Sequence, residues 1–388
     1  MSLSMPQPVY LLFSPQPWNS QQSRTRAFAI ELSRIGCHAI YINPPNSFAG
    51  IVRESIATVA YPLRRETVHF PHIAEMLEVW SPPVFPTFYR GSLTPGFDRW
   101  LFKTWFDKRI KRIKNPMIAI IAMPYWWDGF LNDYGKNFSA TVFDYQDPIV
   151  TYARNARIHQ HMTEVLRELV SDVSGVITHT DANYKSILTY RKASDVCIVR
   201  NGGTAGLGRQ RPNFNNTKRR EHPVIGTVGR ISQNIDTDLL LELADGFPEG
   251  IVVNIGTVST SARSIKTKKN IHLMPPMSLS ELHAKISTFD VGILPYHQNI
   301  EGSPLRVYDL LSESLQILST NFPDAQYFKD VIHIAGSHSE FISKTKGILF
   351  DERNWINGDA IETFLHHNTW GQRVHALKAF CDELCYKV

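Results

Sequence analysis

Short apolar runs, separated by polar and turn-rich stretches, recur along the first half of the chain. They are Val9–Phe13, His38–Ile42, Met117–Met123, Ala140–Tyr145, Gly175–His179 and Cys197–Arg200. Continuous runs of this length predict strands that are buried on both faces, as in a parallel sheet. Segments with helical periodicity, such as Arg26–Ile35 and His159–Asp172, alternate with these strands. The alternation predicts βαβ units and an α/β fold.

The stretch 201–223 interrupts this pattern, because it is rich in Gly, Asn and basic residues and nearly free of bulky apolar ones. Such a composition predicts a linker. The same alternation then restarts, with strands at Val224–Val228, Ile251–Gly256, Ile271–Met274 and Val291–Leu294 and a further strand beginning at Ile317. We therefore predict an N-terminal domain over 1–200, a linker over 201–223, a second domain over 224–365 and a C-terminal helical segment over 366–388. Both domains are expected to be Rossmann-like and doubly wound, with a cleft between them.

Composition narrows the class of protein. The chain has 388 residues, a formal charge of +5 and 43% hydrophobic residues, which suits a globular protein of two domains. Its four cysteines, Cys37, Cys197, Cys381 and Cys385, have no disulfide or zinc spacing. The apolar runs are too short for a signal peptide or a membrane span. We expect a cytoplasmic protein that uses no metal.

Residues 50–97 are rich in proline and aromatic residues. We expect them to form an irregular loop that shapes the binding site of a second substrate, the acceptor. The following segment, Arg99–Lys114, combines an apolar helical face with seven Lys and Arg residues. Two interpretations are compatible with this pattern. The helix packs on the sheet of its own domain, which is the more common case, or it lies on an anionic membrane surface at the inner face of the cytoplasmic membrane. No module typical of nucleic-acid binding accompanies the basic residues.

Several polar and aromatic residues follow the predicted strands of the first domain, at the edge where ligands bind in such folds. The loop after the first strand contains Trp18, Asn19 and Arg24, which we assign to the acceptor side. The alternative is that Trp18 covers the end of the sheet and Arg24 is solvated. Asp144 and Asp147 end another strand and are candidates for a general base. Alternatively, Asp144 accepts from loop amides and Asp147 caps the next helix.

The stretch Asp290–Asn321 carries the strongest signal, because it predicts a strand, a polar loop, a helix and a second strand. Ser303 followed by Pro304 is typical of a helix start, with Ser303 as the N-cap. A helix N-terminus at the carboxyl edge of a parallel sheet is suited to an anion. Arg306 in the first turn and Arg230 from an earlier loop would add guanidinium groups that match phosphate oxygens.

Two acids flank this predicted anion site. Asp309 lies five residues after Pro304, about 7 Å along the axis, which is roughly the step from a diphosphate to its ribose. Glu301 precedes the helix, on the side where a sugar would extend. The pair therefore favours a nucleoside diphosphate sugar. The alternative is that both are surface acids without a ligand.

The segment E-G-S-P-L-R-V-Y-D, 301–309, resembles the donor motif of metal-independent GT-B glycosyltransferases, in which two Glu residues separated by seven positions frame the nucleotide-sugar. Glu301 matches the first, and Asp309 replaces the second. The segments around Trp18 and Asp144 are similar to exopolysaccharide and teichuronic-acid transferases, with Asn19 in place of an Asp. The resemblance implies that Leu273 and Met274 hold the base, that Ser303 and Leu305 contribute to the donor site, and that the C-terminal helix returns to the first domain.

The resemblance implies transfer of a sugar, usually from a UDP-linked donor, to a glycan or a lipid-linked glycan in bacterial polysaccharide biosynthesis. A retaining reaction would use Glu301 to hold the donor sugar, whereas an inverting one needs a base such as Asp147 or Asp144. Both remain open. Several positions depart from the family pattern: Ser312, Ser314 and Gln316 replace its small residues and proline, and Pro275 replaces a glycine.

Two other functions fit parts of the sequence. A nucleotide-sugar epimerase would have the same fold and would use the same donor. A two-lobed binding protein without catalytic activity would usually carry an export signal. No cofactor is expected in any of these cases, since the nucleotide-sugar is a substrate.

Overall fold

The computed structural model describes residues 6–19, 23–46, 68–69, 76–85, 95–146, 156–204, 222–259, 262, 265, 267–300 and 302–386. The chain forms two compact units. The N-terminal unit contains Met1–Arg200 and Arg373–Val388, and the C-terminal unit contains Asn201–Gln372. Each unit is built on its own sheet, so we describe the two separately.

The N-terminal unit has an eight-stranded sheet in the order β3-β4-β2-β1-β5-β6-β7-β8. All its strand pairs are parallel except β3 with β4. The strands are β1 (Val9–Phe13), β2 (His38–Ile42), β3 (Val68–His69), β4 (Leu77–Trp80), β5 (Met117–Ile121), β6 (Ala140–Tyr145), β7 (Gly175–Thr178) and β8 (Val196–Ile198). The order reverses between β1 and β5, which is the switch point of a doubly wound sheet.

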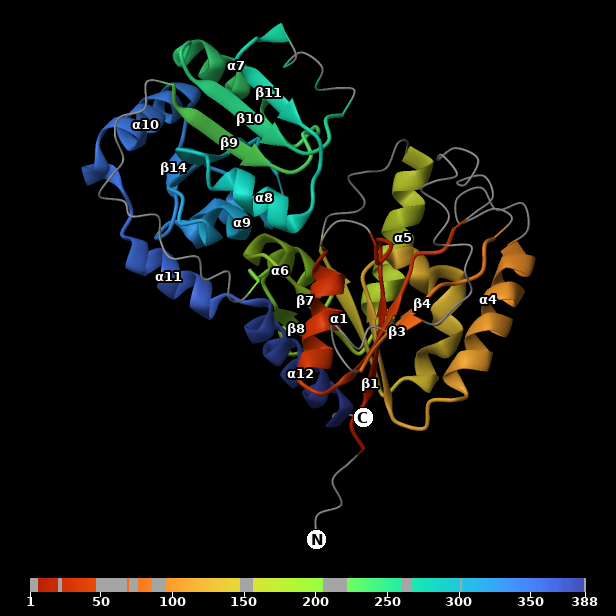
Figure 1. The fold of residues 1–388 in the computed structure, drawn as a ribbon. Coiled ribbons are helices and arrows are strands. Elements are labelled where there is room, and N and C mark those ends of the chain that lie inside the picture. The colour runs from red at the N-terminus through yellow and green to blue at the C-terminus, as the bar shows by residue number, and fades with distance from the viewer. Residues whose placement is uncertain are drawn as a thin grey trace. The chain divides into compact units, whose positions relative to one another are not determined.

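Helices cover both faces of this sheet (Figure 1). They are α1 (Arg24–Arg34), α4 (Pro95–Ile110), α5 (Ala156–Asp172), α6 (Asp181–Ile187) and α12 (Trp370–Tyr386), and short helical turns fill 124–137 and 193–195. Strands β1, β6 and β7 are buried along their whole length, and β2 and β5 are buried except at their first residue. This explains why they read as continuous apolar runs rather than as alternating ones.

The C-terminal helix α12 packs within the N-terminal unit. A methyl group added at Gly175 of β7 would lie 2.6 Å from Leu384 and 2.8 Å from Phe380, so the helix contacts the strand directly. Val374, Leu377 and Cys381 are also buried. Burial raises the pKa of the Cys381 thiol, which keeps it protonated and makes it a packing residue.

Helix α4 packs on the sheet of its own unit. Phe102 and Phe106 are 1% and 0% exposed and join one apolar cluster with Leu11 and Phe13 of β1. The apolar face of this segment is therefore covered by protein, and the more common of the two interpretations is confirmed. The helix begins at Pro95 and ends at Ile110, four residues earlier at each end than the pattern indicated.

The expectation of an irregular stretch over 50–97 is wrong in part. Residues 77–80 form β4, which pairs with β2 in parallel, and α4 begins within the same stretch. Strand β4 contains a polar residue, Glu78, and is directly followed by Ser81-Pro82-Pro83. For these reasons the sequence pattern did not indicate a strand. Most of the remaining residues of this stretch lie outside the described part.

The C-terminal unit has a six-stranded, fully parallel sheet in the order β11-β10-β9-β12-β13-β14. The strands are β9 (Val224–Val228), β10 (Ile251–Ile255), β11 (Ile271–Met274), β12 (Val291–Leu294), β13 (Ile317–Thr320) and β14 (His333–Ala335). The helices are α7 (Thr237–Gly246), α8 (Leu279–Ile286), α9 (Arg306–Ser312), α10 (His338–Phe350) and α11 (Gly358–His367). The switch point lies between β9 and β12.

The first described residues of the predicted linker are integrated into this unit. Gly203 donates to Asn368 O (2.8 Å) and accepts from Trp370 N (2.9 Å) through its backbone. Asn201 accepts from the Tyr308 hydroxyl of α9 at 2.8 Å. Residues 205–221 lie outside the described part.

Among the described residues, no helix is both long enough and apolar enough to span a bilayer.

A glycine at the centre of the second sheet allows the packing of this unit to be tested. Gly226 lies in the middle of β9, and an added Cβ would come within 2.0 Å of the Phe289 ring. We expect Gly226→Ala to lower the free energy of unfolding by about 3 kcal/mol, because the core must shift to accept the methyl group. Urea unfolding measures this. Gly96→Ala is the matched control, since nothing lies within 4 Å of its added Cβ. Equal unfolding midpoints for the two variants would contradict the packing.

Candidate functional site

Two loops of the C-terminal unit form the core of the candidate site. One follows β9 (229–236) and the other follows β12 (295–305), so they flank the switch point of the sheet, where ligands bind in doubly wound folds. Backbone hydrogen bonds join them. Asp236 N donates to Pro295 O (2.8 Å), and His297 N donates to Asn234 O (3.1 Å). The two loops therefore form one ordered platform.

The guanidinium of Arg306 lies against this platform. Its Nη2 donates to Arg230 O at 3.4 Å, and its Cζ lies 5.2 Å from the centre of the Tyr296 ring. Its Nη1 is buried and has no hydrogen-bond partner in the described part of the chain. A buried guanidinium N–H without an acceptor is costly, so an anionic ligand that supplies one would be favoured.

Gly229 makes room for this arginine. Its φ is +97°, and an added Cβ would lie 2.7 Å from Arg306 Nη2 and 2.9 Å from Cζ. A side chain at this position would be strained and would displace the guanidinium. The glycine after β9 is thus required both by the backbone turn and by the position of Arg306.

Asp309 lies on the same helix as Arg306, three residues on, so the two side chains are neighbours on its surface. Burial raises the pKa of Asp309 to about 6, although His283 and Arg306 oppose the shift. No hydrogen bond or ion pair to its carboxylate occurs among the described residues. Hydroxyl donors from a ligand would stabilise the ionised form of such a carboxylate.

Beside Asp309 lies a buried imidazole–carboxylate pair. His283 Nδ1 of α8 and Glu313 Oε1, the residue that ends α9, are 2.8 Å apart and 5% and 4% exposed. This contact holds α8 against α9 and orients the imidazole near Asp309. The sequence analysis did not identify either residue, because they are 30 positions apart and neither belongs to a recognisable motif.

A third group of side chains ties the β9 loop to α10. Asp236 caps α7 by accepting from Leu239 N (3.0 Å), and its other oxygen lies 2.9 Å from His338 Nε2. His338 Nδ1 lies 3.0 Å from Glu242. These two carboxylates raise the pKa of His338, with the Glu242 contact contributing most. Burial acts to raise the pKa of Asp236, but the Leu239 amide and His338 outweigh it and lower the pKa.

The predicted start of the helix at Ser303 and Pro304 is wrong. Helix α9 begins at Arg306, and Leu305 is its N-cap, with no side-chain capping bond. The carbonyl of Ser303 instead accepts a hydrogen bond from Asn201 Nδ2 at 2.8 Å. This bond fixes Ser303 in the loop that precedes α9. The helix has seven residues, so its dipole is small, and Arg306 and the loop amides carry more of the anion-binding potential than the helix does.

The other predicted donor-side residues lie at the same edge of the sheet. Arg230 is exposed directly after Gly229, and Met274 ends β11, where its carbonyl accepts from Gly256 N at 2.9 Å. Glu301 lies outside the described residues. The structure therefore brings together Arg230, Arg306 and Asp309 within two adjacent loops and one helix. Sequence reasoning missed Tyr296, whose signal was an aromatic residue directly after Pro295, the proline that follows β12.

In the N-terminal unit, Arg24 and Asp144 are partners. Arg24 is the first residue of α1 rather than a loop residue, and its Nε donates to both oxygens of Asp144 at 3.0 and 3.1 Å. The two side chains are 3% and 0% exposed. Arg24 is therefore not solvated. Gln146 donates a further bond to Asp144 at 2.8 Å.

This buried pair affects its surroundings. Complete burial raises the pKa of Asp144, and Arg24 and Gln146 act against the shift. Burial, together with the charge of Arg24, lowers the pKa of the adjacent His179 to about 3, so this imidazole is neutral near pH 7. The position of Asp144 fits an internal partner of Arg24 better than a solvent-accessible base. Asp147, the other candidate base, lies outside the described residues.

Trp18 and Asn19 are found in the loop after β1. Trp18 is 4% exposed, packs against Tyr41 with ring centroids 5.1 Å apart, and lies under the Arg26 guanidinium at 4.8 Å. Its amide donates to Asn43 at 2.7 Å. Trp18 thus covers the end of the sheet, whereas Asn19 is exposed.

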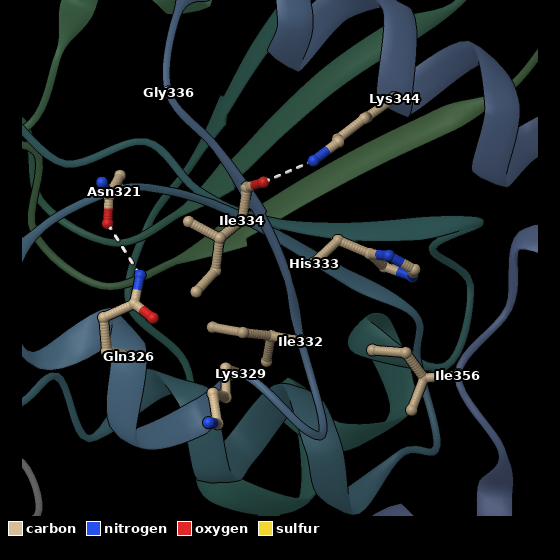
Figure 2. Close-up of a pocket in the computed structure, with 9 residues that line it drawn as sticks. All are labelled: Asn321, Gln326, Lys329, Ile332, His333, Ile334, Gly336, Lys344 and Ile356. Atoms are coloured by element: carbon tan, nitrogen blue, oxygen red, sulfur yellow. Dashed lines mark hydrogen bonds between the residues drawn. The ribbon is translucent and has the colours of Figure 1, made fainter.

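A separate hollow of about 480 Å³ lies beside β14, the edge strand of the C-terminal unit (Figure 2). Its lysine, Lys344, donates to Ile334 O at 2.7 Å, and Gln326 donates to Asn321. The residues of the candidate site do not line this hollow. Among the described residues, no three His, Cys, Asp or Glu side chains are grouped so as to hold a metal ion.

Comparison with known proteins identifies the fold class of this chain. No family model matches the chain. A candidate teichuronic acid biosynthesis glycosyltransferase of Bacillus subtilis (strain 168), TuaH, is 22% identical over 277 residues, which are 68% of this chain and 69% of that protein.

Solved structures match over nearly the whole chain. Sucrose-phosphate synthase from Thermosynechococcus elongatus superposes with a TM-score of 0.75 at 12% identity and covers 99% of this chain and 100% of its own. Anabaena HepE in complex with UDP gives a TM-score of 0.68 at 10% identity, covering 97% and 100%, and S. aureus TarM gives 0.65 at 10% identity, covering 97% and 99%. The chain has the GT-B fold and resembles glycosyltransferases of the teichuronic-acid type.

The raised pKa of Asp309 predicts a pH-dependent stability. The folded pKa of about 6 lies above the ordinary value of 3.8, so ionisation opposes folding. Stability is therefore lost as the pH rises from about 4 through about 6. We expect Asp309→Asn to be more stable than the wild type by about 1–2 kcal/mol at pH 8 and equal to it near pH 4.

Urea unfolding between pH 4 and pH 8 measures this difference. Asp330→Asn is the matched control, because Asp330 is exposed in the same unit. A stability difference between Asp309→Asn and the wild type that does not change with pH would contradict the burial of Asp309.

Proposed function

We propose that this protein is a glycosyltransferase of polysaccharide biosynthesis. It transfers a sugar from a nucleoside diphosphate donor, of which UDP is the best candidate, to a glycan or lipid-linked glycan. The observation that carries the proposal is the Arg306 guanidinium, which lies at the switch point of the C-terminal sheet with a buried Nη1 that lacks a partner in the described chain. The fold and the resemblance to a candidate teichuronic acid glycosyltransferase support it.

In this proposal the C-terminal unit binds the donor. Arg306 and Arg230 bind the diphosphate, together with the backbone amides of Leu305 and Arg306, which donate to no acceptor among the described residues. Guanidinium groups bind phosphate oxygens in a bidentate manner and stay charged at any working pH. Because negative charge builds on the departing diphosphate, the same groups stabilise the transition state, and the proposal requires no metal ion.

Asp309 is the proposed partner of the ribose. It lies one helical turn from Arg306, which matches the separation of a ribose from its diphosphate. Burial raises its pKa, and two ribose hydroxyls would supply hydrogen-bond donors that favour the ionised form. The backbone at Leu273 and Met274 would contact the base, Ser303 would shape the donor loop, and Glu301 would bind the donor sugar.

The N-terminal unit is the proposed acceptor side, where the exposed Asn19 would contact the acceptor and the buried Trp18 would hold the loop after β1 in place. The buried pair of Arg24 and Asp144 would fix the end of this loop, because Arg24 is the first residue of the helix that follows it. Asp147 is the proposed base if the reaction inverts the sugar. If the reaction retains it, Glu301 has the main role and no such base is needed. We propose that the protein works in the cytoplasm, peripheral to the membrane.

The function is tested by incubating the protein with UDP-sugars, with and without glycan or lipid-linked acceptors, and by measuring released UDP and the donor sugar. We expect UDP release that depends on an acceptor. Conversion of the donor sugar without an acceptor would indicate an epimerase instead. Binding of UDP without any turnover would indicate a protein that only binds the nucleotide.

Arg306→Ala is expected to lower kcat by about 100-fold, because a preorganised charge at the departing diphosphate is lost. Arg306→Lys should recover only part of this rate, since a lysine keeps the charge but not the bidentate geometry. Arg353→Ala is the control, as Arg353 is exposed and pairs with Asp351. Unchanged turnover in Arg306→Ala would refute the assignment of this residue.

Asp309→Ala is expected to weaken UDP binding by about 10–100-fold, because two hydrogen bonds to a charged group are lost. Isothermal titration measures the affinity for UDP and for 2′-deoxy-UDP. The wild type should prefer UDP, whereas Asp309→Ala should bind both ligands with similar affinity. If the preference for UDP survives in the variant, Asp309 does not bind the ribose.

A further inference from the structure

Asn201 contacts the loop that leads into α9. This asparagine is the first residue of the C-terminal unit and is 4% exposed. Its Nδ2 donates to the carbonyl of Ser303 at 2.8 Å, although the two residues are 102 positions apart in sequence. Ser303 belongs to the loop 302–305, which leads directly to the amides that we assign to the donor diphosphate. A buried side chain from a distant segment therefore holds this loop.

The backbone of Asn201 is fixed independently of its side chain. Its carbonyl accepts from the Tyr308 hydroxyl of α9 at 2.8 Å. The buried ring of Tyr308 stacks on Phe364 of α11, with ring centroids 6.3 Å apart. Gly203, two residues further on, donates through its amide to Asn368 O at 2.8 Å. The side chain of Asn201 therefore extends from a well-supported segment of backbone.

The other end of the loop has a different support. Arg306 is the first residue of α9, and its guanidinium donates to Arg230 O in the loop after β9. Gly302 has a φ of +138°, a conformation that residues with a side chain rarely adopt. Leu305, the N-cap residue of α9, makes no side-chain capping bond. The direction of the amides of Leu305 and Arg306 is therefore set by the path of the backbone, and the bond from Asn201 fixes this path at Ser303.

The direction of these amides matters for an anionic ligand. Backbone N–H groups stabilise an anion well when they already point to its position, because reorientation on binding costs free energy. A misplacement of about 1 Å at such a site can lower a rate by about 100-fold. The bond to the Ser303 carbonyl requires a side chain that donates a hydrogen bond, and the amide group of Asn201 meets this requirement.

We propose that Asn201 is a positioning residue for the donor site. Its bond to Ser303 orients the amides of Leu305 and Arg306 toward the diphosphate, so it contributes to the affinity for the phosphates and not to that for the base or the ribose. This role rests on the proposed function, because it requires a nucleoside diphosphate to bind at this loop. The composition of 201–223 predicted a linker, and no local pattern indicated a role for Asn201 in binding.

Titrations with UDP and with uridine, which has the base and the ribose without phosphates, test this role. We expect Asn201→Ala to weaken the binding of UDP by about tenfold, because a hydrogen bond that fixes the loop is lost, and to change the binding of uridine by less than about threefold. Equal losses for the two ligands would indicate a general disturbance of the unit and would overturn the proposal. Unchanged binding of UDP would also overturn it.

Asn368→Ala is the matched control, because Asn368 is a second buried asparagine of the same unit. It is 7% exposed, its Nδ2 donates to Phe364 O at 2.7 Å, and its Oδ1 accepts from the Tyr327 hydroxyl at 2.5 Å. We expect this variant to have a lower Tm and to keep the preference of the wild type for UDP over uridine. If Asn368→Ala loses this preference as much as Asn201→Ala does, the packing of the unit and not the bond to Ser303 determines phosphate binding.

Each variant is titrated well below its own Tm, so that only folded protein is compared. Asn201→Ser replaces Asn201→Ala if the alanine variant does not fold. The serine keeps a polar group, but its hydroxyl is one bond closer to the backbone than the amide, so we expect the same selective loss for UDP. Absence of UDP binding in the wild type would refute the proposed function together with this role. Binding of UDP with an unchanged preference in the Asn201 variant would refute this role alone.

Discussion

The guanidinium of Arg306 lies against the backbone of Gly229, and the candidate donor site depends on this contact. Gly229 can accept the arginine because it lacks a side chain and has a positive φ, and Tyr296 supports the guanidinium from the neighbouring loop. The contact joins the loop after β9 to the helix after β12 across the switch point of the sheet. Any ligand held by Arg306 is therefore also held next to both loops.

Buried side-chain pairs support the loops of both units in a similar way. Arg24 and Asp144 form such a pair in the N-terminal unit, and the imidazole of His283 and the carboxylate of Glu313 form one in the C-terminal unit. A buried ion pair such as Arg24 and Asp144 adds little net stability, because the desolvation of two charges offsets most of their attraction. What such a pair does provide is a defined geometry, since breaking it leaves an uncompensated charge. Both pairs link segments that are distant in sequence, and both lie beside residues that we assign to binding.

The apolar and basic side chains of α4 form one amphipathic pattern in the sequence, but they have different environments in the structure. Most of its large apolar side chains complete the core, while Leu101 and Trp105 also line a cavity beside β2 and β4. Its basic residues are divided as well, because Lys103 and Lys108 are exposed whereas the guanidinium of Arg109 packs 4.7 Å from the Trp105 ring. A helical projection alone does not reveal this division.

The sequence by itself determined the fold class, most of the strands and the residues of the donor loops. Strands buried on both faces must be apolar throughout, and the loops after β9 and β12 carry arginine, glycine and acids at recognisable spacings. Only the tertiary structure decided that Arg24 pairs with Asp144, that α9 begins at Arg306 rather than at Pro304, and that β4 joins the sheet. These features depend on contacts between segments up to 120 residues apart, and local propensity carries no information about such contacts.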